Sequence, residues 1–173
     1  MKASLTAMLF FVIWAPPSGQ QRATDVDGWQ GAKWDMSLEQ IKAAINYPIE
    51  AYPEFKNVFR ITRSIEINSI PVSVSFQMPD DKLRLVTLKV DKSYGRSLAF
   101  DSLKQSLIEK YGKPTDEESK TEHPIPGNNE ITDVRRTVLW SFPSTSIILD
   151  WGEYKSSGNV FVLYKKVDKK TPL

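Results

Sequence analysis

The strongest constraint on the fold is an amphipathic stretch that runs from Phe100 to Tyr111. Five apolar residues recur there at spacings of three and four, which places them on one stripe of a helical period; they are Phe100, Leu103, Leu107, Ile108 and Tyr111. Ser97 is expected to cap the helix start, Gly112 suits the position after the last turn, and Pro114 prevents continuation. Because most of the remaining chain has strand patterns, we expect this helix to lie across a sheet.

The opposite side of the same helix is polar and is predicted to face water. It carries Lys104, Gln105, Glu109 and Lys110.

A second, shorter helix is predicted to begin at Ser37. Gln40 follows three residues later, which is the spacing of a capping box, and Met36 can contact Ile41 as a hydrophobic staple. The helix should end near Asn46, because Pro48 disfavours helical geometry in the residue before it.

The rest of the patterned sequence has a period of two, which is typical of half-buried strands. Alternating or β-branched runs occur at 58–63, 64–68, 72–78, 83–90, 136–142, 145–151 and 159–167. In the 83–90 run the apolar residues change parity at Leu85 and Val86, which indicates either a bulge or burial on both faces.

The stretch from Lys113 to Asp133 has hardly any apolar residues and is predicted to be a long loop. It contains the only imidazole, His123, and the adjacent amides Asn128 and Asn129. Long loops of this kind are often functional, so these three residues are candidate partner-binding residues.

These elements predict an α+β fold, with an antiparallel sheet of about six to seven strands and two main helices packed on one face. Ile41, Ile45 and Pro48 are spaced as Leu107, Tyr111 and Pro114 are. The two helices can therefore each begin one copy of an α-plus-meander repeat, with halves at 34–90 and 97–167.

The N-terminus has the features of a secretory signal. Lys2 precedes an apolar run from Leu5 to Ala15, which is shorter than a membrane span and is followed by two prolines. We expect residues 1–23 to be a signal peptide and processing region, with cleavage between Gly19 and Ala23. Residues 24–173 would then form a single domain in the periplasm or outside the cell, with no stable membrane insertion.

The amino-acid composition excludes several kinds of metal site and of partner. The chain has 173 residues, no cysteine and one histidine, so thiolate and multi-histidine metal sites are excluded, and no metal or other cofactor is predicted. Its 23 Lys and Arg residues nearly balance its 21 Asp and Glu residues, and this balance argues against a nucleic-acid partner.

Tryptophan supplies two further candidates for a contact surface. Trp140 and Trp151 lie in patterned strands, where packing is expected, whereas Trp29 and Trp34 lie in or beside a polar arm. If Trp29 and Trp34 are exposed, they mark a partner-binding surface.

Two segments resemble those of small exported bacterial proteins of unknown function. One is Trp34-Asp35-Met36-Ser37-Leu38-Glu39-Gln40-Ile41, and the other is Leu107-Ile108-Glu109-Lys110-Tyr111-Gly112-Lys113-Pro114. The layout is also similar, more loosely, to the small lipoproteins of outer-membrane assembly and to β-lactamase inhibitor protein. The chain lacks the lipid-bearing cysteine of the lipoproteins, and the resemblance brings no catalytic residues.

Two functions are consistent with these features. The first is a non-catalytic binding or assembly module of the bacterial envelope, which binds another envelope protein through one sheet face, the Lys113–Asp133 loop or a strand edge. The second is a small carboxylate-dependent hydrolase that uses Asp150, Glu153 or His123 in a cleft assembled from distant residues. A flat apolar patch would favour the module, and a pocket with facing carboxylates would favour the hydrolase.

Overall fold

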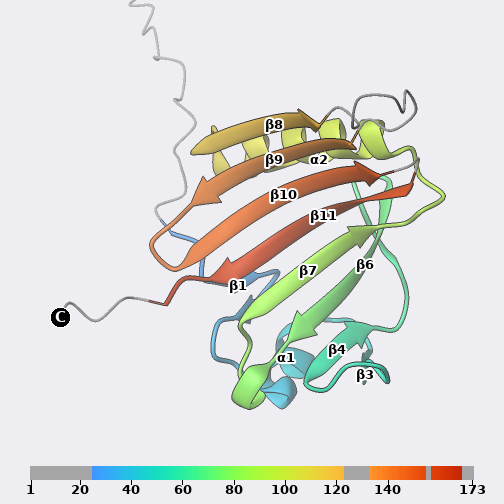
Figure 1. Cartoon of the computed structure of the whole chain (residues 1–173). Coiled ribbons are helices and arrows are strands. Elements are labelled where there is room, and N and C mark those ends of the chain that lie inside the picture. The colour runs from blue at the N-terminus through green and yellow to red at the C-terminus, as the bar shows by residue number, and fades with distance from the viewer. Residues whose placement is uncertain (1–24, 123–132, 155–156, 169–173) are drawn as a thin grey trace, which may run out of the picture.

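A computed structural model describes residues 25–122, 133–154 and 157–168, and the predicted signal region therefore lies outside the described residues. The fold is α+β, with two α-helices and a large antiparallel sheet in the described part of the chain (Figure 1). The helices are α1 (Leu38–Ala44) and α2 (Arg96–Tyr111).

The strand order shows how the two halves of the chain combine. The first half supplies β3 (Ile49–Ala51), β4 (Val58–Ile61), β6 (Ile70–Gln77) and β7 (Leu85–Val90), with the short β5 (Ile65–Ile67) paired to β6. The second half supplies β8 (Asp116–Glu122), β9 (Asp133–Ser141), β10 (Thr145–Tyr154) and β11 (Ser157–Lys166). The order β3-β4-β6-β7-β11-β10-β9-β8 joins the last strand of each half at the centre of one sheet.

This arrangement agrees with two α-plus-meander units, but the sheet is larger than expected. It has nine strands in the described residues, and β1 (Gly28–Trp29) and β2 (Ala32–Lys33) form a separate small hairpin. The two strands that were not expected in the large sheet are β3, which has too few residues to show a period, and β8.

The prediction of a loop from Lys113 to Asp133 is wrong for 116–122. This segment is the edge strand β8, which pairs with β9 from Asp116↔Leu139 onward. Its charged side chains gave no apolar pattern, but charge is a common property of edge strands because it discourages pairing with other chains. Residues 123–132 lie outside the described part of the chain.

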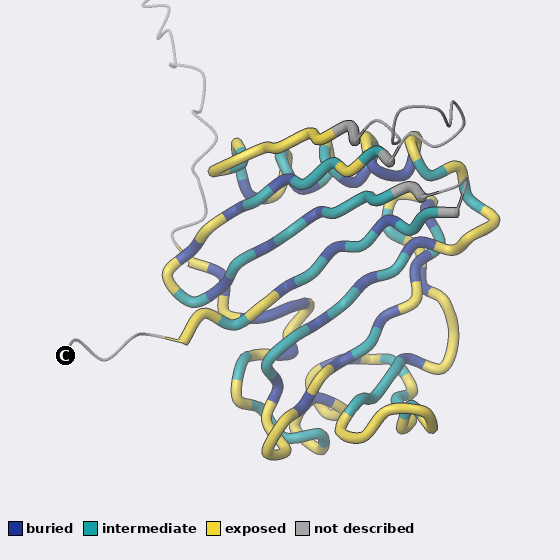
Figure 2. The backbone as a smooth tube through the Cα atoms, viewed as in Figure 1, coloured by how far each residue is buried: buried dark blue, intermediate teal, exposed yellow. Residues whose placement is uncertain are grey.

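One hydrophobic core lies between the sheet and α2, and Figure 2 shows the regular alternation of buried positions along the strands. Val74 in β6, Leu88 in β7, Val162 in β11, Leu149 in β10 and Val138 in β9 form a buried row across the sheet. Helix α2 packs against β10 and β11 with its buried residues, which are Ala99, Phe100, Leu103, Leu107 and Tyr111.

Two predicted features of α2 need correction. The helix begins at Arg96 with Gly95 as its N-cap, so Ser97 lies inside the first turn. Lys104 does not face open water: its ammonium group lies 2.6 Å from Glu117 of β8 and ties the edge strand to the helix. The predicted end at Gly112 is confirmed, and the Trp140 Nε1 donates to the Gly112 carbonyl at 2.8 Å.

Helix α1 begins as predicted. Ser37 accepts from the backbone of Gln40, and the Gln40 side chain accepts from the backbone of Ser37, which completes the capping box. Ile41 is fully buried in the common core.

Candidate functional site

The candidate site is the face of the sheet that points away from α2. We call it the open face and define it by the outward residues of β6, β7, β11, β10 and β9. No described helix or strand lies in front of these strands in Figure 1. Its largest apolar residues are all only partly buried; they are Leu85, Leu139, Ile148, Phe161 and Leu163.

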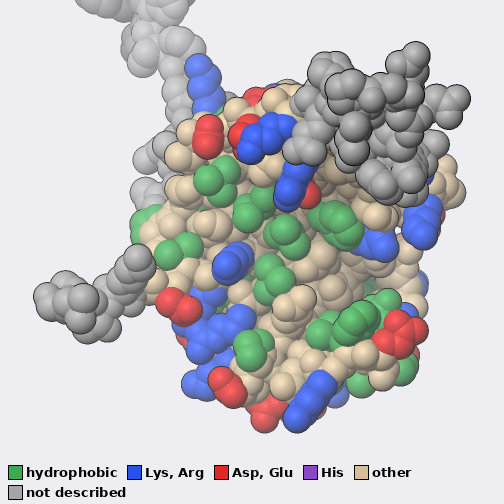
Figure 3. Space-filling view, viewed as in Figure 1, with side chains coloured by type: hydrophobic (Ala, Val, Ile, Leu, Met, Phe, Trp, Pro, Cys, Tyr) green, Lys and Arg blue, Asp and Glu red, His purple; other side chains and the backbone are tan. Residues whose placement is uncertain are grey.

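The open face has an apolar centre because of strand register. Ile148 of β10 pairs with Leu163 of β11 on one side and with Leu139 of β9 on the other, so the three side chains form a continuous row. Thr87 of β7 continues this row beside Leu163. Figure 3 shows hydrophobic side chains over the middle of this face, with charged side chains around them.

Some of the polar side chains on this side of the sheet are paired. Asp150 accepts from Thr137 Oγ1 at 2.8 Å and from Arg135 Nε at 3.1 Å. Arg60 lies 2.8 Å from Glu50. A polar rim around an apolar centre is the usual organisation of a protein–protein interface.

Two recesses flank the central row. The first has a volume of about 520 Å³ and lies over β6 among residues of β4, β7 and β11. The second has a volume of about 730 Å³ and is lined by Leu85, Ile148, Leu163 and Lys165, together with residues near the ends of β6 and β11.

Trp29 is not part of an exposed surface, so the expectation that it could mark one is wrong. The side chain is 3% exposed, and the centroid of its ring lies 6.1 Å from the ring centroid of Phe76 in the sheet. The β1–β2 hairpin packs against the core and places Trp29 inside it. The polar residues around Trp29 in the sequence gave no indication of this burial.

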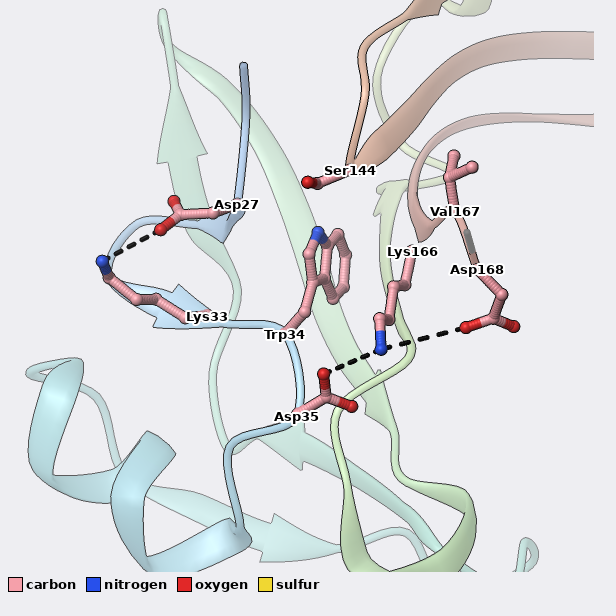
Figure 4. A pocket seen from close by; sticks show the side chains of 8 residues that line it. All are labelled: Asp27, Lys33, Trp34, Asp35, Ser144, Lys166, Val167 and Asp168. Atoms are coloured by element: carbon pink, nitrogen blue, oxygen red, sulfur yellow. Dashed lines mark hydrogen bonds and ion pairs between the residues drawn. The ribbon is translucent and has the colours of Figure 1, made fainter. Parts of the chain in front are cut away.

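Trp34 is half-buried and lies at a separate recess of about 550 Å³. Its Nε1 donates to Thr145 Oγ1 at 2.7 Å, and the Thr145 hydroxyl in turn donates to the Val26 carbonyl. Figure 4 shows the indole between the Asp27–Lys33 ion pair and the Lys166–Asp168 pair. The indole therefore anchors the N-terminal segment to the sheet and leaves part of its ring accessible.

The charges beside Trp34 form a closed network. The Asp35 carboxylate lies 2.7 Å from Lys166 Nζ and 2.8 Å from Arg84 Nη1. The Asp168 carboxylate lies within 4 Å of both cationic groups. The hydrogen bond from Lys166, with further help from the charge of Arg84, holds the pKa of Asp35 below its ordinary value. The network connects the segment before α1 to the end of β11.

The other predicted site residues are not brought together here. His123, Asn128 and Asn129 lie outside the described residues, as does the side chain of Glu153. Of the hydrolase candidates, Asp150 lies on the open face, where it is engaged by Arg135 and Thr137.

The described residues contain neither a metal-binding cluster nor a membrane-spanning helix. No group of three or more His, Cys, Asp or Glu side chains is placed to hold a metal ion there. None of the described helices combines the length and the apolar character that a membrane span requires.

Sequence reasoning missed the apolar residues of the open face. The signal was present, because β9, β10 and β11 contain uninterrupted apolar runs such as Val138-Leu139-Trp140 and Ile147-Ile148-Leu149. Successive side chains of a strand point to opposite faces of the sheet. Every second residue of each apolar run packs against α2, so the residues between them must lie on the opposite face.

No protein-family model, no curated protein and no solved structure matches this chain.

Proposed function

We propose that this protein is an exported, non-catalytic binding module of the bacterial cell envelope that holds another envelope protein on its open face. The observation that carries the proposal is the row Leu139–Ile148–Leu163, which is apolar, continuous and without a covering element in the described residues. An apolar patch of this kind on a sheet typically marks an interaction site.

The dimensions favour a protein partner. The row from Thr87 to Leu139 crosses four adjacent strands, which corresponds to about 14 Å at the usual strand spacing. A surface of this width, with recesses on both sides, suits the side chains of a second protein better than one enclosed small molecule.

The envelope location rests on the N-terminal sequence. Lys2 and the apolar run from Leu5 to Ala15 have the order of charge and hydrophobicity that directs a chain to export. A partner met after export is then an envelope protein.

The proposal is tested by crosslinking in the native cells. A photoreactive phenylalanine derivative is placed at Ile148, in the centre of the open face, and in a matched chain at Gln105, which is exposed on α2. We expect irradiation to give a specific adduct with an envelope protein from position 148 and none from position 105.

A substitution completes the test. Ile148→Lys should abolish capture of the protein identified in that adduct, whereas Gln105→Lys should leave capture unchanged, with both variants checked for folding by circular dichroism. Equal adducts from the two positions, or no adduct from position 148, would overturn the proposal. An adduct that joins two copies of this chain would overturn the proposal that the partner is another protein.

A further inference from the structure

The recess over β6 arises from a difference in side-chain size. Ser73 and Ser75 point outward on β6, while larger residues stand on both sides: Val58 and Arg60 on β4, and Lys89 on β7. The serine side chains are too short to fill the space between their neighbours. A hollow of about 520 Å³ remains, which lies within the range of ligand-binding pockets.

The wall on the β3–β4 side is aromatic and cationic. The rings of Tyr52 and Phe55 pack edge to face, with 5.2 Å between their centroids. The Arg60 guanidinium lies 4.9 Å from the centre of the Tyr52 ring. Phe55 is 57% exposed, so its ring is available to a partner. The charge of Arg60 is already balanced by Glu50 at 2.8 Å.

The opposite wall has the same composition but a different charge balance. Lys89 Nζ lies 5.9 Å from the centre of the Phe161 ring. No carboxylate in the described part of the chain forms an ion pair with Lys89. Asp150, which lies opposite Phe161 on β10, is bound by Arg135 and Thr137. Among the described residues, the recess therefore combines aromatic walls with one cation, Lys89, that has no paired carboxylate.

We propose that this recess is the anchor site for an aromatic side chain of the partner protein that has a carboxylate next to it. This inference rests on the proposed function. Aromatic rings pack favourably against the edges and faces of Tyr52, Phe55 and Phe161, and a carboxylate beside the ring supplies the missing counter-charge to Lys89. Buried aromatic anchors of this kind commonly dominate the binding energy of an interface.

The test uses short blocked peptides as probes of that chemistry. The isotope-labelled full chain is titrated into the millimolar range with N-acetyl-Phe-Asp-amide, and the backbone amide signals of Ser73, Ser75, Lys89 and Phe161 are followed by NMR. The neutral isostere N-acetyl-Phe-Asn-amide and the peptide N-acetyl-Ala-Asp-amide are titrated in parallel. We expect the Phe-Asp peptide to bind about two- to fivefold more tightly than the Phe-Asn peptide, and the Ala-Asp peptide to give no saturable shift.

Two variants locate the charge. Lys89→Gln should remove the preference for the acidic peptide, whereas Lys165→Gln, on the same face but outside this recess, should retain it. Phe55→Ala should weaken binding of both Phe-containing peptides. Equal binding of the Phe-Asp and Ala-Asp peptides, or a preference for Asp that survives Lys89→Gln, would overturn the inference.

Failure of this inference can be distinguished from failure of the proposed function. An adduct from position 148 without peptide binding in the recess overturns the anchor site and supports the open face as an interface. Peptide binding without any adduct overturns the protein partner, and with it the role of the recess as that partner's anchor.

Discussion

Lys166, near the end of β11, binds Asp35 with 2.7 Å between its Nζ and the carboxylate, although 131 positions separate the two residues in the chain. Asp35 has a φ of 65°, a left-handed conformation that Asp and Asn tolerate better than most residues. Asp35→Asn therefore removes the charge without adding backbone strain.

This ion pair should make stability depend on pH. The folded state lowers the pKa of Asp35 below 3.8, so the pair contributes stability above that value and loses it as the pH falls through the folded pKa. Urea unfolding of the wild type and Asp35→Asn at a series of pH values should show the variant less stable at neutral pH, with the gap narrowing below 3.8. A gap that is constant with pH would contradict this account.

Gly28 should not tolerate a side chain. It has a φ of 149°, and a Cβ added there would lie 2.0 Å from the Ala32 carbonyl oxygen in the facing strand. Gly28→Ala should reduce the free energy of unfolding by at least about 1 to 3 kcal/mol, because it forces strain in the β1–β2 hairpin. Gly152→Ala is the matched control, since no described residue other than its chain neighbours comes within 4 Å of its added Cβ, and the expected change is under about 0.5 kcal/mol. Equal midpoints of denaturant unfolding for Gly28→Ala and Gly152→Ala would show that the added Cβ at Gly28 does not clash.

The buried stripe of α2 should dominate the helix's contribution to stability. Leu107 is 6% exposed, so Leu107→Ala should destabilise by about 2 to 5 kcal/mol through lost burial and the cavity that remains. Gln105 is exposed and makes one side-chain bond to Glu109 at 3.0 Å, so Gln105→Ala should cost under about 0.5 kcal/mol. Chemical denaturation measures both, and similar losses would mean that the stripe is assigned to the wrong side of the helix.

Export can be tested with the natural N-terminus. In a Gram-negative host we expect the protein in the periplasmic fraction, with cleavage between Gly19 and Ala23 seen by mass spectrometry. Lys2→Glu should slow export, because it reverses the positive charge before the apolar run. Full-length protein confined to the cytosol would refute export and the envelope part of the proposed function.

The features that could be predicted from the sequence are local ones. The capping box of Ser37 and Gln40 and the stop at Gly112 depend on residues within one or two turns, and the structure confirms both. The fold class followed from the change of period along the chain.

The features that were missed depend on distant partners. β8 is a strand because β9 supplies its hydrogen bonds, and its charged sequence has no strand pattern of its own. Trp29 is buried because its hairpin meets Phe76, far away in the sequence. The open face was hidden for a related reason: the assignment of Ile148 to an uncovered surface requires the position of α2.

The pairing of β7 with β11 has a consequence for the order of folding. During synthesis β11 is the last of the described strands to become available, yet it lies at the centre of the sheet and pairs with both β7 and β10. Any sheet that β6 and β7, or β9 and β10, form before β11 pairs has an unpaired edge, and such edges promote association between chains. Formation of the native sheet therefore depends on a contact between distant parts of the sequence, and such contacts favour slow folding.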